Sequence, residues 1–120
     1  MNRKHAYSDF KAQIEYLRSK NPRFSISTDI IVGFPGETDA EFEETLCAME
    51  ECSFDFAYVA RYSARKGTYA TDKIGDDVPS DVKADRWNRA NALLERICKE
   101  RNAAMVGRKE KILITGMAKK

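Results

Sequence analysis

Two short stretches of the chain combine residue types that could bind a ligand. Residues 33–37 form a Gly-Phe-Pro-Gly-Glu turn after an apolar run, and glycines in such a turn let a ligand approach the backbone closely. Residues 58–69 mix positive charge with aromatic rings, which suits a nucleotide or a nucleic-acid strand. The turn matches neither a phosphate-binding P-loop nor a dinucleotide fingerprint, because the Gly-Lys-Ser/Thr sequence and the three-glycine spacing are missing.

Each stretch also has a purely structural interpretation. A Gly-Pro-Gly turn is a good connector between a strand and a helix, and basic residues in an exposed loop can simply reach into solvent. Asp29 is the one acid in the apolar run before the turn. It could be a hydrogen-bonded structural carboxylate or a contact to a hydroxyl group of a ligand. The patterns alone leave these alternatives open.

Other catalytic arrangements are missing from the sequence. His5 is the only histidine and stands near the terminus, so no Ser/His/Asp set can be assembled around it. Cys47, Cys52 and Cys98 lack the spacing of a zinc site, and we expect them to be buried small apolar groups in a reducing compartment. No apolar run reaches the roughly 18 residues that a membrane span needs, and no signal peptide is visible. We therefore expect a cytoplasmic protein without a metal site or catalytic residue of its own.

Charge is distributed unevenly along the 120 residues, whose formal net charge is +2. Residues 99–120 carry seven lysines and arginines against two acids, so a basic end follows a mildly acidic body. Such an end suggests contact with a polyanion, although it also serves as a solubilising tail. A chain with 42% hydrophobic residues is neither a disordered tail nor, at 33% charged residues, a membrane protein.

Patterns typical of helices and strands alternate along the chain. Apolar residues at helical spacing predict helices over residues 8–20, 38–49 and 80–105. Ser8 is expected to cap the first helix, and Gly107 to stop the last. Thr38 and Glu41 form a capping box for the second. On the last helix we expect two solvent-exposed ion pairs, Asp85 with Arg89 and Glu95 with Lys99.

Runs of β-branched and aromatic residues predict strands over residues 24–32, 54–62 and 111–116. Strands that alternate with amphipathic helices predict an α/β fold with a parallel sheet. We expect the first strand to be covered on both faces, and a loop to follow the second strand as far as Val78. Two strands before the long helix cannot close a barrel, so we expect the sheet to be completed by something absent from this sequence.

The motifs resemble, in order and over nearly the whole chain, the methylthiotransferases of the radical S-adenosylmethionine (SAM) superfamily. They lie at residues 1–3, 28–38, 54–59, 62–68, 77–86 and 106–116. The two strands look most like the MiaB type, a transferase that adds a methylthio group to N6-isopentenyladenosine next to the tRNA anticodon. Lys66 stands where the family usually has proline. A relative that modifies a ribosomal protein and a self-standing RNA-binding module are the alternatives.

The resemblance also implies a domain organisation. Residues 1–105 would be the C-terminal part of a radical SAM domain, a partial TIM-type barrel, including a linking helix at 80–105. Residues 106–120 would begin a truncated TRAM domain, a small β-domain that binds RNA, so tRNA is implied as a partner of the basic C-terminus. Met1 would be an internal methionine, and the N-terminal half of the same enzyme would be the missing partner.

Members of the family use SAM and two 4Fe–4S clusters. The cysteines that hold these clusters have no counterpart in this sequence, so we expect the chain alone to be inactive. The resemblance implies that Asp29, Ile31 and Gly33 face the adenosyl part of SAM, with Tyr62 and Arg65 beside the same mouth. Alternation along the strand agrees, since it places the first three of these residues on one face.

Overall fold

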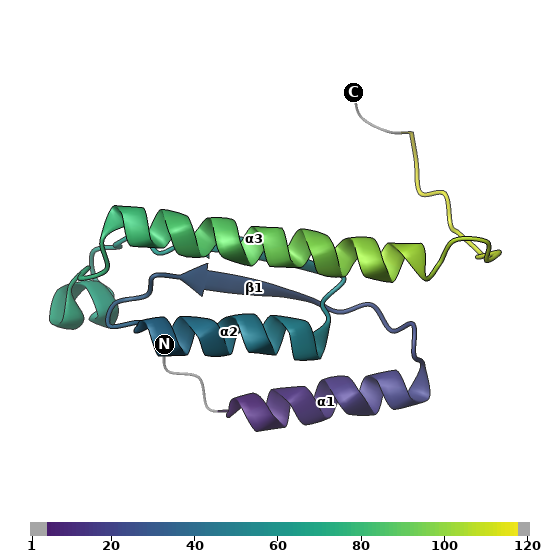
Figure 1. Ribbon diagram of the computed structural model, residues 1–120, viewed down its shortest axis with the longest axis horizontal. Coiled ribbons are helices and arrows are strands. Elements are labelled where there is room, and N and C mark those ends of the chain that lie inside the picture. The colour runs from purple at the N-terminus through teal and green to yellow at the C-terminus, as the bar shows by residue number, and fades with distance from the viewer. Residues whose placement is uncertain (1–4, 118–120) are drawn as a thin grey trace.

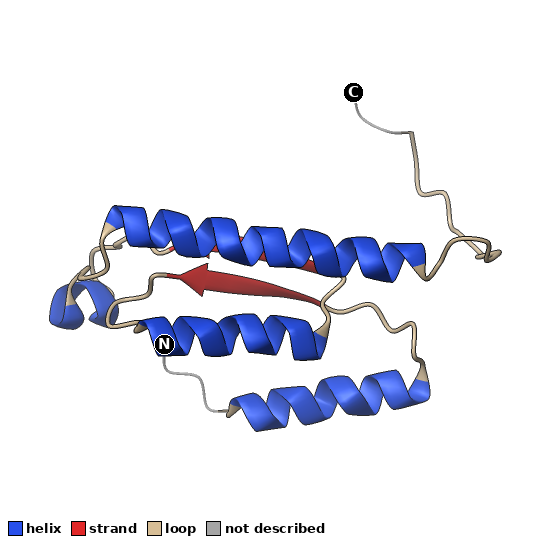
Figure 2. Cartoon of the chain, in the orientation of Figure 1, coloured by secondary structure: helices blue, strands red, loops and turns tan. Residues whose placement is uncertain are grey.

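In a computed structural model that describes residues 5–117, the chain is an α/β unit of helices packed on a parallel sheet (Figures 1 and 2). The elements in chain order are α1 (Tyr7–Lys20), β1 (Ser27–Val32), α2 (Asp39–Cys52), β2 (Phe56–Arg61), η1 (Ala70–Ile74) and α3 (Ser80–Ala103). The predicted fold class is confirmed at this level. Motif residues 1–3 and the last lysines of the basic end lie outside the described residues.

The sheet consists of β1 and β2, which pair in parallel from Ser27 opposite Phe56 to Val32 opposite Arg61. The connection between them runs through α2, as expected for a β-α-β unit. The capping box predicted for this helix is present, because the Thr38 side chain accepts a hydrogen bond from the Glu41 amide at 3.2 Å and the Glu41 carboxylate accepts one from the Thr38 amide at 2.8 Å.

One face of the sheet is covered and the other is open. Val32 and Val59 are buried against the helices. On the opposite face, Ile31, Phe56 and Tyr58 are 39%, 60% and 63% exposed. The alternation predicted for β1 is therefore correct, but the expectation that both of its faces are covered is wrong. The described part of the chain supplies a layer of helices on one side only.

The core lies between the sheet and the three long helices, which Figure 1 shows running along the covered side. Its members are apolar side chains of all five of these elements and of the segment before β2, including Ile14, Val32, Phe42, Met49, Phe54, Ala90, Leu94 and Ile97. Burying each of the larger side chains contributes about 1.5–3 kcal/mol. The Trp87 indole attaches α3 to β2 by donating a hydrogen bond to the Val59 carbonyl oxygen at 2.8 Å.

A polar cluster fastens the elements at the amino end of the sheet. The Asp55 carboxylate accepts hydrogen bonds from the Ile26 amide at 2.8 Å and from Arg101 Nε at 2.6 Å. Arg18 of α1 donates to the Ser53 carbonyl oxygen at 2.8 Å. Burial raises the pKa of Asp55, but the bonds from Arg101 and Ile26 outweigh burial and hold the pKa below its usual value. The carboxylate is therefore charged and links the segments before β1 and β2 to Arg101 of α3, and Arg18 of α1 lies 3.9 Å from it.

Two helix ends differ from the prediction. Helix α1 is capped by Ala6 rather than Ser8, because the Asp9 carboxylate accepts a hydrogen bond from the Ala6 amide at 3.0 Å. Helix α3 ends at Ala103, before Gly107, because the residues that follow are exposed and nothing packs against a longer helix. Gly107 still terminates the turn after the helix, with φ of +81°.

The strand predicted over residues 111–116 does not form. Residues 108–115 have no regular secondary structure, and Ile112, Leu113 and Ile114 are 80%, 87% and 82% exposed. No strand of residues 5–117 lies beside this segment to pair with it. Within the same described range, no helix is both long enough and apolar enough to cross a membrane.

One of the two ion pairs predicted on α3 is confirmed, with Lys99 Nζ at 2.7 Å from Glu95. The other is wrong, because Arg89 pairs with Glu43 of the neighbouring helix α2 instead of Asp85. The packing of α2 beside α3 supplies this partner, and a sequence pattern confined to one helix cannot show it.

Candidate functional site

A hollow of about 910 Å³ opens at the carboxyl ends of β1 and β2. Its walls are mainly apolar and include Ile31, Phe34, Tyr62, Arg65, Tyr69 and Ile74. The structure thus brings together Ile31, Tyr62 and Arg65, three of the residues selected from the sequence. Ligands of parallel α/β folds bind at this edge, because the loops that follow the strands meet there.

The other two selected residues lie close by but outside the wall. Asp29 is exposed on the open face of the sheet, opposite Tyr58 in the strand pairing. Gly33 is buried, and its amide donates a hydrogen bond to Glu37 Oε2 at 2.7 Å. Its φ of +68° and the stem of Lys83 packed against it leave no room for a side chain. In this structure Gly33 shapes the turn, and ligand contacts of Asp29 and Gly33 stay predictions.

Tyr62 is held on several sides. Its amide donates a hydrogen bond to the Val32 carbonyl oxygen at 2.9 Å, which extends the pairing of the sheet beyond β2. Its hydroxyl lies 2.9 Å from Thr71 Oγ1. The Phe34 ring meets the Tyr62 ring edge-on with 5.3 Å between centroids. The side of the hollow formed by Phe34 and Tyr62 is therefore a fixed wall.

The loop after β2 is organised around the Thr71 hydroxyl. This oxygen accepts a hydrogen bond from the Arg65 amide at 3.0 Å and lies 3.0 Å from the Thr68 hydroxyl. Thr71 belongs to η1, a π-helix in a segment predicted to be a plain loop. Single turns of π-helix often occur at functional sites. The exposed Arg65 guanidinium thus extends from a backbone that is fixed at the rim of the hollow.

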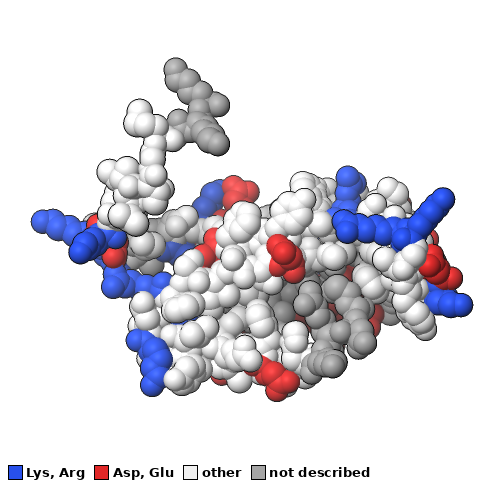
Figure 3. Space-filling model, turned by 180° about the vertical axis from the view of Figure 1, so that it is seen from behind, with Lys and Arg blue, Asp and Glu red and all other residues white. Residues whose placement is uncertain are grey.

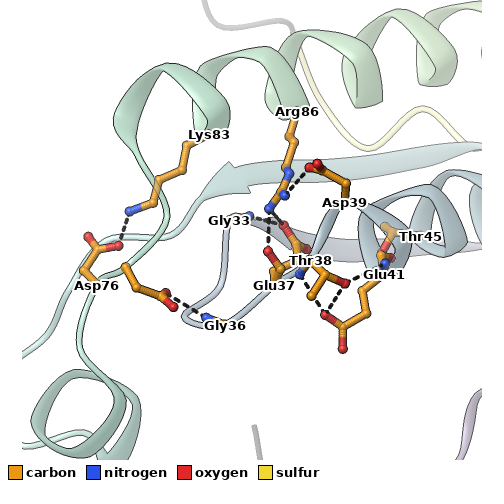
Figure 4. Close-up of polar contacts among 11 residues, drawn as sticks. Gly33, Gly36, Glu37, Thr38, Asp39, Glu41, Thr45, Asp76, Lys83 and Arg86 are labelled. Carbon is orange, nitrogen blue, oxygen red and sulfur yellow. Dashed lines mark hydrogen bonds and ion pairs between the residues drawn. The ribbon is translucent and has the colours of Figure 1, made fainter.

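The turn of residues 33–37 is held by contacts with Arg86 of α3, as Figure 4 shows. Arg86 is 4% exposed and donates to Glu37 Oε2 at 2.7 Å and to Asp39 Oδ1 at 2.7 Å. Burial lowers the pKa of Arg86, but the bonds and charges of Asp39 and Glu37 outweigh it, so the pKa lies above its usual value. The Gly36 amide donates to Asp77 Oδ1 at 2.8 Å. The turn is thus tied to the segment that leads into α3.

Lys83 is the second buried cation of α3 and pairs with Asp76 (Figure 4). Sequence reasoning assigned no role to Lys83 or Arg86, although both lie in the motif at residues 77–86. The feature of the sequence that indicates their burial is the spacing along the helix, because both residues lie on the same buried stripe as Ala90 and Leu94. A charged residue on such a stripe indicates a buried partner, which here comes from the turn and from the segment before α3.

The thiols of the chain do not fit an iron–sulfur cluster. The expectation of buried cysteines is wrong for Cys47, which is exposed on α2, whereas Cys52 is buried with its sulfur 3.7 Å from the Tyr7 hydroxyl. Cys98 Sγ donates to the Asp55 carbonyl oxygen at 3.1 Å. No group of three or more histidine, cysteine or acidic residues in residues 5–117 could hold a metal ion. A cluster needs several thiolates converging on one point, and these thiols have separate surroundings.

Comparison with known proteins gives close relatives but no match to a family model. The chain is 46% identical over 114 residues to the tRNA-2-methylthio-N(6)-dimethylallyladenosine synthase of Corynebacterium diphtheriae. The aligned residues cover 95% of this chain and 22% of that protein. It is 42% identical over 120 residues to the synthase of the same name from Caldicellulosiruptor saccharolyticus, covering 100% of this chain and 25% of that protein. The Clostridium botulinum protein of this name is 42% identical over 119 residues, 99% of this chain and 26% of that protein.

These matches confirm the family that the motifs predicted: the chain is related to the methylthiotransferases along nearly its whole length. More particularly, it is related to the tRNA-2-methylthio-N(6)-dimethylallyladenosine synthases. The chain spans about a quarter of the length of these curated relatives.

Proposed function

We propose that this chain forms part of a radical SAM methylthiotransferase that adds a methylthio group to N6-isopentenyladenosine next to the tRNA anticodon. The observation that carries the proposal is the apolar hollow at the carboxyl edge of two parallel strands, in a chain 42% identical over its full length to a synthase named for that product. The names of the relatives favour a tRNA substrate over a ribosomal protein.

In this proposal residues 1–105 are the last part of a partial barrel, with residues 80–105 as its linking helix. The open face of the sheet supports it, because Ile31, Phe56 and Tyr58 are large apolar groups left exposed. They would face the barrel interior. Residues 106–120 would begin the TRAM domain, and the exposed apolar residues at 112–114 would pair with a strand from the rest of that domain.

SAM would occupy the hollow, where this chain's residues bind and orient it for the cluster that cleaves it. Ile31 and Phe34 offer an apolar wall for the adenine ring, and Asp29 could accept hydrogen bonds from ribose hydroxyls. Arg65 at the rim could pair with the SAM carboxylate. The clusters themselves would be held by other parts of the enzyme. We therefore expect these 120 residues alone to be inactive.

Basic residues of two segments would contact tRNA phosphates. They lie at the rim of the hollow, in residues 61–66, and in the exposed segment 108–111. In the view from behind, lysines and arginines lie mainly toward the two ends of the molecule, and the visible surface between them is mostly uncharged with a few acidic side chains (Figure 3). Such an arrangement suits an RNA that is held by its backbone while a base reaches an apolar site.

A chimeric enzyme tests this function. The aligned segment of the Caldicellulosiruptor saccharolyticus synthase is replaced by this chain, and methylthio transfer to tRNA and the Kd for SAM are measured. We expect transfer to be retained, and Ile31→Asp in the chimera to raise the Kd at least about tenfold, which is about 1.4 kcal/mol. Tyr16→Asp, an exposed site on α1, is the control. An unchanged Kd for Ile31→Asp would remove β1 from the SAM site.

A further inference from the structure

Lys83 occupies an unusual place for a lysine. Its side chain is only 9% exposed, and it lies on the buried stripe of α3 without lining the hollow. The carbon stem packs against Gly33, with Cδ 3.2 Å from the place where a Cβ of residue 33 would stand. The ammonium group pairs with Asp76 and lies 5.4 Å from the centre of the Tyr62 ring. One side chain thus contacts both the turn after β1 and the aromatic wall of the hollow.

Filling this space does not require a charge. A methionine would occupy the same volume beside Gly33, and replacing a buried ion pair with apolar groups is often neutral or stabilising. Asp76 is 36% exposed, so water can solvate its carboxylate if the ammonium is lost. The specific effect of the ammonium is on Tyr62, because a cation near an aromatic ring is attracted by the ring's electrons.

The attraction between the Lys83 ammonium and the Tyr62 ring would affect a bound ligand through the position of Tyr62. Its hydroxyl is held by Thr71 and its ring by Phe34, and the ammonium of Lys83 completes the set of contacts. Phe34 and Tyr62 both line the hollow. A change at Lys83 would therefore be transmitted to the wall through Tyr62, and to the end of β1 through Gly33.

We propose that Lys83 is a positioning residue for the ligand-binding wall: its buried ammonium fixes the Tyr62 ring while its stem supports Gly33. The contact between Lys83 and Tyr62 is present in this chain and does not depend on the proposed function. Its effect on SAM binding rests on the function proposed above. The two parts are therefore tested separately.

The first experiment follows the tyrosine rings of the 120-residue chain by NMR with selectively labelled tyrosine. Tyr62→Phe identifies the Tyr62 signal. We expect Lys83→Met to shift and broaden this signal while the Tm stays within a few degrees, because the space remains filled. Lys99→Met removes a lysine from an exposed ion pair of the same helix and should leave the signal unchanged. A Tyr62 signal that Lys83→Met does not alter overturns the proposal.

If Lys83→Met fails to fold, Lys83→Arg decides the matter. Arginine keeps the positive charge, so we expect a Tyr62 signal close to that of the parent chain. In a Lys83→Arg variant that still unfolds cooperatively in urea, a Tyr62 signal displaced from its position in the parent chain overturns the proposal, because the retained charge then does not fix the ring.

The second experiment measures SAM binding by the chimeric synthase. We expect Lys83→Met to raise the Kd about fivefold at unchanged Tm, and Lys83→Arg to restore most of the affinity. A chimera that does not bind SAM contradicts the proposed function. The NMR experiment then still tests whether Lys83 fixes the Tyr62 ring. A chimera that binds SAM equally well with Lys83→Met contradicts the positioning role and leaves the proposed function standing.

Discussion

The guanidinium of Arg86 lies 2.7 Å from the carboxylate of Glu37, although 49 residues separate the two in sequence. The same carboxylate oxygen accepts the hydrogen bond of the Gly33 amide. Both charged side chains are largely buried, at 5% and 11% exposed. The turn that forms one wall of the hollow is therefore held in place by α3, a helix that contributes no lining residue.

Removing one partner of this ion pair should lower the stability of the fold. Arg86→Met leaves the Glu37 carboxylate buried without its charge partner, so we expect the free energy of unfolding to fall by about 3–5 kcal/mol. Urea unfolding followed by the fluorescence of Trp87, the only tryptophan, measures this. Arg89→Met breaks the exposed pair with Glu43 and should cost at most about 1 kcal/mol. Equal losses for the two variants would show that Arg86 is no more important than a surface residue.

Gly33 and Gly67 allow the close packing of Lys83 to be measured. Both have positive φ, at +68° and +83°, so alanine is strained by about 1–2 kcal/mol at either position. At Gly67 nothing lies within 4 Å of the added Cβ, whereas at Gly33 it would clash with the Lys83 stem. We expect Gly33→Ala to lose about 1–3 kcal/mol more than Gly67→Ala in urea unfolding, because of overpacking.

A double variant separates crowding from backbone strain. Lys83→Ala shortens the side chain that Gly33→Ala would meet, so the two changes together should destabilise less than the sum of their separate effects. Strict additivity would mean that the stem of Lys83 does not limit residue 33.

Local features of the fold could be predicted from the sequence. The capping box of Thr38 and Glu41 and the alternation along β1 depend on residues close in the chain or on patterns within one element, and the parallel pairing follows from the alternation of strands and helices. Long-range partners could not be predicted. Arg89 pairs with Glu43 because α2 lies beside α3. The strand expected at 111–116 does not form, because a strand needs a neighbouring strand to pair with and the described residues offer none there.

The candidate site was predictable in the same limited way. The family resemblance selected the candidate residues, and the structure places Ile31, Tyr62 and Arg65 around one hollow at the carboxyl edge of the strands, while their contacts with a ligand stay predictions. Sequence reasoning gave Lys83 and Arg86 no role, because the residues of the turn that they contact, Gly33 and Glu37, precede them by 50 and 49 residues. The buried stripe of α3 indicates that both side chains have partners, but the identity of these partners depends on how α3 packs against that turn.

The stability of the chain should fall at acidic pH through Asp55. Burial raises the pKa of this carboxyl, but the hydrogen bonds from Arg101 and Ile26 outweigh burial and leave the folded-state pKa below the unfolded value of about 3.9. Its stabilising contribution is therefore complete above about pH 4 and is lost as the pH falls through the lower, folded-state pKa.

Urea unfolding at several pH values between 6 and 2 measures this dependence. Asp55→Asn should be less stable at pH 6 and should show a flatter decline toward low pH. Glu44→Gln, which removes an exposed carboxylate of α2, is the control and should follow the parent chain. A decline that Asp55→Asn leaves unchanged would assign the acid sensitivity to other carboxylates.

The basic end of the chain should contribute to RNA binding and little to stability. Residues 106–117 are exposed, and Glu110 reaches the rest of the chain through a surface ion pair with Arg23. Deleting residues 106–120 should therefore change the free energy of unfolding by less than about 1 kcal/mol. The affinity for tRNA should fall, and the plot of log K against log salt concentration should become shallower by about 0.7–0.9 for each phosphate that the shortened chain no longer neutralises. Exchanging the five lysines and arginines of this segment for glutamine tests whether charge is responsible: the same decrease in slope is expected, and a slope equal to that of the parent chain would place the tRNA-binding surface elsewhere on the molecule.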